Sequence, residues 1–434
     1  MSIVLPAIVR TFLLASTAVQ MYRHGAAEQL PEPFNGFQAV SVQLNHMHMT
    51  SSNWLPGDPT LEFSARTSSN PRYHFHTVAG RYVVLSFLGS AAHPSVQQAV
   101  AHIHARPQRF DDAKLCFFGV SIDQSDETAG RLRDTIPGIR YLWDFDRKVS
   151  HAYGALESAT GLQGQSMQYQ PFTLVLDPML RVLAHLPMLP VERHNQALDH
   201  ILATLPPVAD HAASPLCAPV LILPRVLEPE LCSELVQLYR REGGEASGFM
   251  REIHGKTVAV MDNNFKRRKD FAFDTQPQFE KLRAAIRARL LRRLVPEIRR
   301  AFQFQVTRME RYVVACYDST EGGLFRPHKD NTTLGTAHRR FACTINLNAG
   351  EYEGGNLRFP EFGPQTYRAP TGGAVVFSCS LLHEATPVVS GTRYAFLPFF
   401  YDDAAARIRQ QNLHSLTGEV FDHGKGEDEG SIAA

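Results

Sequence analysis

The 434-residue sequence lacks a large net charge, a long apolar run and closely spaced cysteines, and its formal net charge is +1. Its 44 Lys and Arg residues balance 43 Asp and Glu residues, which argues against a dedicated nucleic-acid binder, because such proteins depend on a basic excess. No uninterrupted apolar segment reaches the roughly 20 residues that a membrane-spanning helix needs. At about 150 residues per domain, the length predicts a soluble protein of two or three domains with no membrane partner.

The cysteines are few and dispersed. They are Cys116, Cys217, Cys232, Cys316, Cys343 and Cys379, and they form no CxxC motif. Several lie in apolar runs such as LCFFGV and VFSCSLL, where a buried free thiol is the simplest interpretation. Disulfide frameworks are typical of small secreted domains with dense cysteine, so we expect a reducing compartment, the cytoplasm by default.

The N-terminal segment MSIVLPAIVRTFLLASTAVQM is apolar and free of acidic residues, as a targeting peptide would be. However, Arg10 interrupts the apolar part, and no basic residue precedes it. We therefore favour a frayed extension or a misplaced start codon over a targeting segment.

Shifts in composition divide the chain into segments. The stretch TLPPVADHAASPLCAP concentrates Pro, Ala and Ser between two periodic regions, which indicates a linker. The end of the chain is polar, and we expect it to be disordered. The predicted segments are an N-terminal extension (1–30), a first domain (31–205), a linker (206–224), a second domain (225–405) and a polar tail (406–434).

The first domain alternates strands and helices. YVVLSFL, LCFFGVSI and QPFTLVL are apolar runs of strand length. Helical segments such as GSAAHPSVQQAVAHIHA, ETAGRLRDTI and VERHNQALDHILATL lie between or after them. Continuous apolar strands that alternate with helices predict an α/β sheet covered on both faces.

The second domain begins with helices and continues as short strands. In QFEKLRAAIRARLLRRLVPEIRRAF, apolar residues recur at helical spacing, and Pro296 is expected to break the helix in two. From about residue 306, the strands RYVVACY, FACTINLN, GAVVFSCSLL and RYAFLPFFY follow one another between Gly and Pro. This pattern predicts a β-sandwich or a jelly roll.

The strongest chemical signal is the pair His328 and Asp330, followed by His383 and Arg393. Residues i and i+2 of a strand face the same side, so His328 and Asp330 can converge on one ion, although such a pair is common by chance. With His383 they form the two-histidine, one-carboxylate set of non-haem Fe(II) oxygenases, which leaves metal positions open. Arg393 lies in an apolar strand, and its guanidinium suits a carboxylate.

The second domain resembles Fe(II)/2-oxoglutarate oxygenases of the prolyl 4-hydroxylase type. The resemblance covers about residues 307–403 and rests on ACYDSTEGGLFRPHKDN, YEGGNLRFPEF, APTGGAVVFSCSLLHEATPV and GTRYAFLPFFYDD. It implies a double-stranded β-helix (jelly-roll) core within an α+β domain. It also implies oxidative decarboxylation of 2-oxoglutarate to succinate and CO₂, coupled to hydroxylation of a C–H bond by O₂.

The resemblance assigns roles to individual residues. His328, Asp330 and His383 would bind Fe(II), and Arg393 would bind the distal carboxylate of 2-oxoglutarate. Tyr317 occupies the place of a tyrosine that contacts the same carboxylate, with a core aromatic as the alternative. Asn346 replaces another family tyrosine, so its contact with the co-substrate is doubtful. Gly354 and Gly355 match a tight turn that needs positive φ or a close backbone approach. The carboxylate of Asp330 favours hydroxylation over halogenation, because halogenating relatives lack it.

The first domain resembles the thioredoxin-fold peroxiredoxins over about residues 35–205, on YVVLSFLGSAAHPSVQQ, LCFFGVSIDQSDE and QPFTLVLDPMLRVLA. In that family a peroxidatic cysteine opens the helix after the first long strand, where the helix N-terminus lowers its pKa. The corresponding segment here, GSAAHP, has no cysteine, and Cys116 lies inside a strand. We therefore expect a non-catalytic domain, in which His93 is a solvated residue and not a catalytic one.

Two further clusters are basic. Lys266, Arg267, Arg268 and Lys269 form a run that we interpret as a solvated loop, with a site for an acidic peptide or nucleic acid as the alternative. His338, Arg339 and Arg340 follow the His328 region, and their position suggests a loop over the substrate entrance.

The sequence as a whole predicts an Fe(II)- and 2-oxoglutarate-dependent dioxygenase with prolyl-hydroxylase-like chemistry, fused to a degenerate peroxiredoxin-like domain. The expected substrate is a peptidyl proline or a small molecule, and L-ascorbate is a candidate further cofactor. The first domain offers a route to homo-oligomers. The alternatives are a scaffold protein whose domains are both degenerate and a thiol peroxidase fused to an oxygenase.

Overall fold

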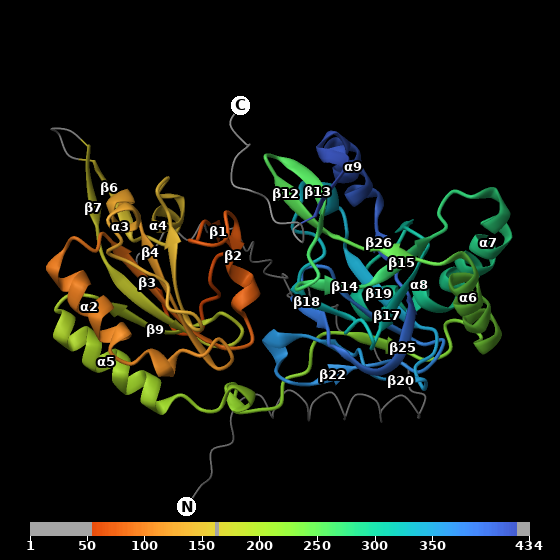
Figure 1. Ribbon diagram of the computed structural model, residues 1–434, viewed down its shortest axis with the longest axis horizontal. Helices are drawn as coiled ribbons and strands as arrows, with labels where there is room; N and C mark the ends of the chain where they lie inside the picture. Colours follow the sequence, from red (N-terminus) through yellow and green to blue (C-terminus); the bar gives the residue numbers. More distant parts are fainter. Residues whose placement is uncertain (1–53, 161–164, 423–434) are drawn as a thin grey trace, which may run out of the picture. The chain divides into compact units, whose positions relative to one another are not determined.

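A computed structural model describes residues 54–160 and 165–422 (Figure 1). The expected N-terminal extension and the final residues of the expected tail lie outside these ranges. Within the described part of the chain, no helix combines the length and the apolar character needed to cross a membrane. All six cysteines are free thiols, as the sequence predicts.

The N-terminal domain is built on a mixed sheet of order β5-β4-β3-β8-β9. Its strands are β3 (Tyr82–Gly89), β4 (Leu115–Ser121), β5 (Ile139–Trp143), β8 (Phe172–Leu176) and β9 (Val182–Pro187). β3, β4 and β5 run parallel, whereas β8 and β9 are antiparallel to their neighbours. Every residue of β3 and β8 is buried, which explains why these strands read as continuous apolar runs.

Alternate side chains of this sheet enter two separate apolar clusters. Val84 and Phe117 pack with α2 (Pro94–His104) and α5 (Val191–Thr204) on one face. Their neighbours Val83 and Phe118 pack on the other face with Val149 of α4 (Lys148–Ala152) and with apolar residues that precede β3. The α/β prediction for this domain is therefore confirmed.

Smaller elements complete the N-terminal domain. They are β1 (Ser64–Ala65), β2 (Tyr73–His74), α3 (Gln124–Thr128), β6 (Leu156–Thr160) and β7 (Gln165–Tyr169). The helix predicted through ETAGRLRDTI is wrong beyond Thr128, because Gly130 adopts φ +63° and ends it.

Two sheets form the main part of the C-terminal domain. The larger follows the path β10-β23-β19-β25-β17-β15-β11, and the smaller has the order β14-β18-β24-β21-β22. The strands of the larger are β10 (Leu221–Leu223), β11 (Glu245–Ala246), β15 (Lys269–Ala272), β17 (Val313–Asp318), β19 (Phe341–Asn346), β23 (Ala374–Ser378) and β25 (Val388–Phe396). Those of the smaller are β14 (Lys266–Arg267), β18 (Leu324–His328), β21 (Leu357–Arg358), β22 (Thr366–Tyr367) and β24 (His383–Ala385).

Short strands extend these sheets. β16 (Arg308–Glu310), β20 (Tyr352–Gly354) and β26 (Phe399–Tyr401) lie at the side of the larger sheet, and β12 (Phe249–Ile253), β13 (Lys256–Met261) and β27 (Leu416–Asp422) form a separate three-stranded sheet.

Helices pack on the larger sheet through an apolar stripe. α6 (Pro229–Glu242), α7 (Glu280–Arg289) and α8 (Val295–Phe302) share one cluster with β17, β19, β23 and β25. Between α7 and α8 the chain forms a π-helical turn over Leu290–Leu294, and Pro296 opens α8. The chain stays helical through this region, so the predicted break takes the form of a π-helical turn before Pro296, which lacks the N–H that a continuous α-helix would use.

The limits of the C-terminal domain extend beyond those expected from the sequence. Leu221–Leu223, within the segment assigned to the linker, pairs with β23. The expected disorder of the tail is wrong for α9 (Asp403–Asn412) and for Leu416–Asp422, which pairs in parallel with β13. The α9 helix is capped by Asp402, whose side chain accepts from Ala405 N, a polar signal that composition alone does not distinguish from disorder.

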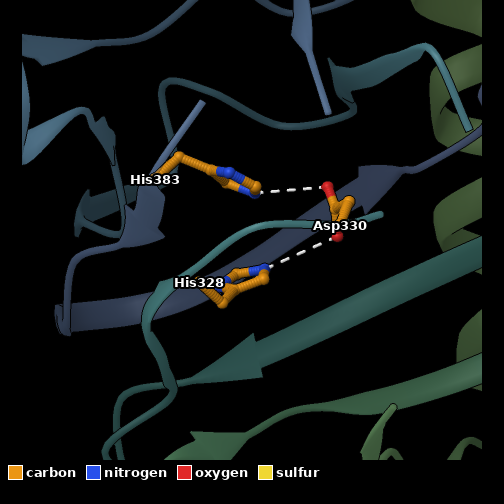
Figure 2. A group of neighbouring side chains, drawn as sticks. All are labelled: His328, Asp330 and His383. Atoms are coloured by element: carbon orange, nitrogen blue, oxygen red, sulfur yellow. Dashed lines mark ion pairs between the residues drawn. The ribbon is translucent and has the colours of Figure 1, made fainter. Parts of the chain in front are cut away.

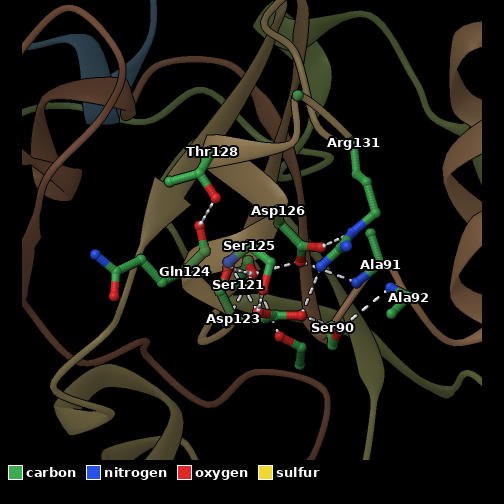
Figure 3. Close-up of polar contacts among 12 residues, drawn as sticks. Ser90, Ala91, Ala92, Ser121, Asp123, Gln124, Ser125, Asp126, Thr128 and Arg131 are labelled. Atoms are coloured by element: carbon green, nitrogen blue, oxygen red, sulfur yellow. Dashed lines mark hydrogen bonds and ion pairs between the residues drawn. The ribbon is translucent and has the colours of Figure 1, made fainter.

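A buried carboxylate fixes the loop that follows β3 (Figure 3). Asp126 is fully buried, and its Oδ2 accepts from Ala91 N at 2.9 Å and from Ser121 Oγ at 2.7 Å. Its Oδ1 pairs with Arg131 Nε at 2.6 Å. One side chain therefore connects β4, α3 and the residues between β3 and α2.

We expect Asp126→Ala to destabilise the N-terminal domain by about 2–4 kcal/mol, because two buried donors and an arginine lose their acceptor. Tryptophan fluorescence during denaturant unfolding measures this, since the two tryptophans, Trp54 and Trp143, both lie in this domain. The control is Asp146→Ala, whose side chain is 58% exposed and which should cost under about 0.5 kcal/mol. Equal unfolding midpoints for the two variants would contradict the structural role of Asp126.

Candidate metal and co-substrate site

Antiparallel pairing of β18 with β24 places His328 directly opposite His383. Asp330 follows β18, where its backbone N donates to Cys379 O at 3.0 Å. Asp330 Oδ1 lies 3.6 Å from His328 Nε2, and Oδ2 lies 3.3 Å from His383 Nε2 (Figure 2). One ligand atom from each residue lies within 4.8 Å of the others, a spacing that allows all three to hold one metal ion. The convergence of these three side chains agrees with the sequence analysis.

Backbone carbonyls orient both imidazole rings. His328 Nδ1 lies 2.7 Å from Arg326 O, and His383 Nδ1 lies 3.0 Å from Leu381 O. A carbonyl only accepts, so each Nδ1 carries the proton and each Nε2 keeps a lone pair. Such an outer hydrogen bond is the usual means of fixing a metal-binding histidine.

The charge states of the cluster also suit a metal. Burial, together with the neighbouring His383, holds the pKa of His328 well below its usual value. Burial raises the pKa of Asp330, but His383 and His328 outweigh it and hold that pKa below its usual range. Neutral imidazole and ionised carboxylate are the forms that bind metal ions, and these shifts favour them at His328 and Asp330.

Arg393 supplies a buried cation beside this cluster. It lies opposite Tyr317 in the pairing of β17 with β25, its side chain is 2% exposed, and its Cζ is 4.8 Å from the Tyr317 ring centroid. Among the described residues, its Nε and Nη1 have no hydrogen-bond partner. Arg393, His328, Asp330 and His383 line one cavity. A buried guanidinium with unused donors is costly unless an anion binds it, so the arrangement suits a carboxylate ligand.

The predicted tight turn at Gly354 and Gly355 is confirmed. Both have positive φ, +73° and +62°. A Cβ on Gly354 would lie 2.2 Å from Pro387 O, and one on Gly355 would lie 3.0 Å from Arg393 Cδ. The second glycine therefore lets the chain approach the side chain of Arg393 closely.

Tyr317 and Asn346, the other residues that the sequence assigned to the site, lie in different positions relative to the cavity. Tyr317 lines the cavity and is 3% exposed, and its hydroxyl accepts from Arg268 Nη1 at 3.3 Å. Asn346 does not line it, because its Nδ2 donates to Ala369 O at 2.7 Å. The structure therefore brings Tyr317 to the site and leaves Asn346 outside it.

The interpretation of residues 266–269 as a solvated loop is wrong for Lys266 and Arg268, whereas the side chain of Lys269 is 45% exposed. Lys266 and Arg268 are 6% and 8% exposed, and both line the cavity. Arg268 Nη2 pairs with Asp270 Oδ2 at 2.6 Å. The alternation of Lys266, Arg268 and Asp270 in the sequence could have predicted that these charged side chains share one face. Every second residue of an extended segment faces the same side.

His338 and Arg339, which the sequence suggested for an entrance loop, are buried, and Arg339 lines the cavity. These residues are 2% and 9% exposed, and both bind Glu310. His338 Nε2 lies 2.7 Å from Glu310 Oε2, and Arg339 Nη2 lies 2.6 Å from Glu310 Oε1. Arg339 Nη1 also lies 3.5 Å from Asp330 O, at the limit of a hydrogen bond, so this buried network supports the backbone of a candidate metal ligand.

The N-terminal domain has no cysteine in residues 89–94, where β3 ends and α2 begins. His93 caps α2, with its Nδ1 accepting from Ser95 N at 3.3 Å. Cys116, the one cysteine between residues 31 and 205, is fully buried within β4, and burial raises its pKa to about 12. A thiol in this state cannot provide thiolate at neutral pH.

Comparison with known proteins agrees with this division. The AhpC/TSA family matches residues 56–185. A PKHD-type hydroxylase from Stenotrophomonas maltophilia is 30% identical over 108 residues, which are 23% of this chain and 47% of that protein. The chain joins an AhpC/TSA-type domain to a domain similar to PKHD-type hydroxylases. It spans about half the length of the curated relatives that it matches.

The chain also matches solved structures at low identity and low TM-score. A Pseudomonas putida prolyl-4-hydroxylase is 19% identical, with a TM-score of 0.31, and the match covers 45% of this chain and 96% of the other. A Xanthomonas campestris bacterioferritin comigratory protein is 18% identical, with a TM-score of 0.28, and the match covers 32% and 90%.

We expect Cys116 in the AhpC/TSA-type domain to be chemically inert. In the native protein, iodoacetamide should label the exposed Cys217 and leave Cys116 unmodified until the domain is unfolded. Peptide mapping by mass spectrometry measures both sites in one sample. Labelling of native Cys116, or peroxide consumption that is lost in Cys116→Ser, would contradict this assignment.

Proposed function

We propose that the hydroxylase-like domain is an Fe(II)- and 2-oxoglutarate-dependent dioxygenase that hydroxylates a C–H bond. The observation that carries the proposal is the buried guanidinium of Arg393, without an anionic partner among the described residues, in the cavity that holds His328, Asp330 and His383. A metal site alone would not need this cation, and a carboxylate-binding site alone would not need the three ligands.

The two-sheet architecture supports a finer fold assignment. β18 and β24 of the smaller sheet carry the histidines, and β17 and β25 of the larger sheet carry Tyr317 and Arg393. We propose that these sheets are the two halves of a double-stranded β-helix, with the cavity between them.

The donor set fits Fe(II). Two imidazole nitrogens and one carboxylate form the facial set of non-haem Fe(II) oxygenases, whereas a structural zinc site would have four protein ligands. Fe(II) bound here would supply the activation of O₂ that hydroxylation of an unactivated carbon requires. The chain's own residues hold the metal, orient the co-substrate and shield both from water.

Arg393 would bind the distal carboxylate of 2-oxoglutarate, with its unused Nε and Nη1 atoms as donors. Tyr317 accepts from Arg268, which leaves its own O–H free to donate to the same carboxylate. Arg339 and Glu310 would keep Asp330 in position through the contact with its backbone. The substrate is proposed to be a prolyl residue or a small molecule, and ascorbate is proposed to maintain the reduced metal.

We expect Asp330→Ala to abolish 2-oxoglutarate-dependent succinate formation, even with excess Fe(II), because the metal loses its only anionic protein ligand. Mass spectrometry of succinate and metal analysis of the purified protein measure the two effects together. Asp403→Ala, a change of a 59% exposed aspartate, is the matched control and should retain wild-type turnover. Sustained turnover by Asp330→Ala would refute the proposed metal site.

We expect Arg393→Met to raise the KM for 2-oxoglutarate by roughly tenfold to a hundredfold, the range of one charge-assisted hydrogen-bonded contact. The same variant without ligands should be no less stable to heat than the wild type, because it removes a buried cation that lacks an anion. Steady-state kinetics and calorimetry measure these effects. An unchanged KM would show that the co-substrate binds elsewhere.

A further inference from the structure

The cavity of the hydroxylase-like domain contains more cations than the proposed cofactor and co-substrate require. Five of its cationic residues are Lys266, Arg268, Arg311, Arg339 and Arg393. Arg268 pairs with Asp270 at 2.6 Å, and Arg339 pairs with Glu310 at 2.6 Å. Arg393 is assigned to 2-oxoglutarate. Lys266 and Arg311 have no carboxylate partner in the described part of the chain.

Lys266 lies close to the metal ligands. Its Nζ is 4.8 Å from the ring centroid of Phe325, and that ring stacks on His328 with 3.5 Å between centroids. The Nζ donates to Ser247 Oγ at 2.7 Å and to Gly248 O at 2.5 Å, both uncharged acceptors. An ammonium has three N–H donors, so one of them is available to a ligand.

Arg311 lines the same cavity. Its Nε donates to Leu397 O at 3.0 Å, and its Cζ lies 4.3 Å from the Phe399 ring centroid. Arg339 lies 4.0 Å from the same ring and contacts Asp330 O. Arg311 has φ +60°, a conformation that costs an L-residue roughly 1 kcal/mol and that is often retained at functional positions.

These two cations also raise the energy of the empty cavity. Burial, and repulsion from Arg268 and Arg311, hold the pKa of Lys266 well below its usual value. Burial, and repulsion from Arg339, lower the pKa of Arg311 to about 10. When Fe(II), Asp330, 2-oxoglutarate and Arg393 are together, their formal charges cancel. The positive charge of Arg311 therefore remains after the cofactor and co-substrate bind, and an anion bound beside Lys266 would favour the protonated form of that lysine.

We propose that the substrate of this site carries an anionic group that Lys266 and Arg311 bind next to the metal. This inference rests on the proposed function, because it assigns Arg393 to 2-oxoglutarate. A planar guanidinium suits a carboxylate bidentately, and a lysine adds a point charge, so we infer a substrate with a carboxylate close to the carbon that is hydroxylated.

A binding experiment without turnover tests the anion site. The protein is saturated with Zn(II), which has no redox chemistry, and with 2-oxoglutarate, so that Arg393 is occupied. Inorganic sulfate is then titrated by calorimetry. We expect wild-type protein to bind sulfate, and Arg311→Gln and Lys266→Met each to weaken binding about tenfold or more. Arg300→Gln, a change of an 81% exposed arginine, should bind as wild type does. Equal affinity in wild type and Arg311→Gln, or no binding to either, overturns the proposal.

A substrate screen tests the chemical class. N-acetyl amino acids are offered as free acids and as primary amides, and phosphoserine is paired with serine, with succinate formation and an added oxygen as readouts. The proposal predicts at least tenfold higher kcat/KM for the free acid of an accepted pair, and Arg311→Gln should remove that preference. Preference for phosphoserine would change the anion from carboxylate to phosphate. Equal use of the acid and the amide overturns the proposal.

The two hypotheses fail in different ways. If the Zn(II)-loaded protein does not bind 2-oxoglutarate, the proposed function fails, while the comparison of sulfate affinities between wild type and Arg311→Gln still reports on the anion site. If 2-oxoglutarate binds and decarboxylates but anions have no effect, only the inference about the substrate fails.

Discussion

The candidate site depends on the register between β18 and β24. In an antiparallel pair, directly opposite residues have Cβ atoms about 5 Å apart, which is how His328 and His383 meet across two strands far apart in the sequence. A slip of one residue would turn one imidazole to the opposite face of the sheet and remove the site. The register changes between Phe325 and His328, so an irregularity just before the ligand sets its direction. Asp330 lies two residues after His328, and its carboxylate meets both imidazole rings.

The buried charged side chains of the two domains differ in how completely they are paired. In the AhpC/TSA-type domain, Asp126 is fully buried and both of its oxygens are bonded, so the group has a structural role. In the hydroxylase-like domain, Arg393 is buried with donors unused, and Lys266 and Arg311 lack carboxylates among the described residues. An uncompensated buried charge costs stability, and we propose that anion binding offsets this cost in the hydroxylase-like domain. Asp126, by contrast, stabilises the fold of the N-terminal domain.

The sequence predicted the features that follow from local pattern. Continuous apolar runs predicted β3 and β8, Pro296 marked the change of helix geometry between α7 and α8, and two consecutive glycines marked a turn with positive φ. The grouping of His328, Asp330 and His383 was predicted from strand periodicity and family resemblance together. These features depend on backbone preferences or on spacing within a strand, both of which are visible in one sequence.

Features that depend on tertiary environment were missed. A run of Lys and Arg has the same composition whether it is solvated or buried, so the burial of Lys266 and Arg268 could not be read from composition. The partner of Arg339 is Glu310, which is 29 residues away and is reached only through the sheet. The role of Asn346 also needed the structure, since a side chain that bonds Ala369 O is not available to the cavity. The polar tail was misjudged because α9 is stabilised by its cap and by packing, not by apolar composition.

The proposed metal and co-substrate site is tested most directly by an anaerobic titration of the wild-type protein with Fe(II) and 2-oxoglutarate, followed by calorimetry and visible absorption. The account predicts one Fe(II) and one 2-oxoglutarate per chain, with tight 2-oxoglutarate binding only when the metal is present and with a new absorption band from the metal–co-substrate complex. Binding of Fe(II) without any effect on 2-oxoglutarate, or no binding of either, would contradict it.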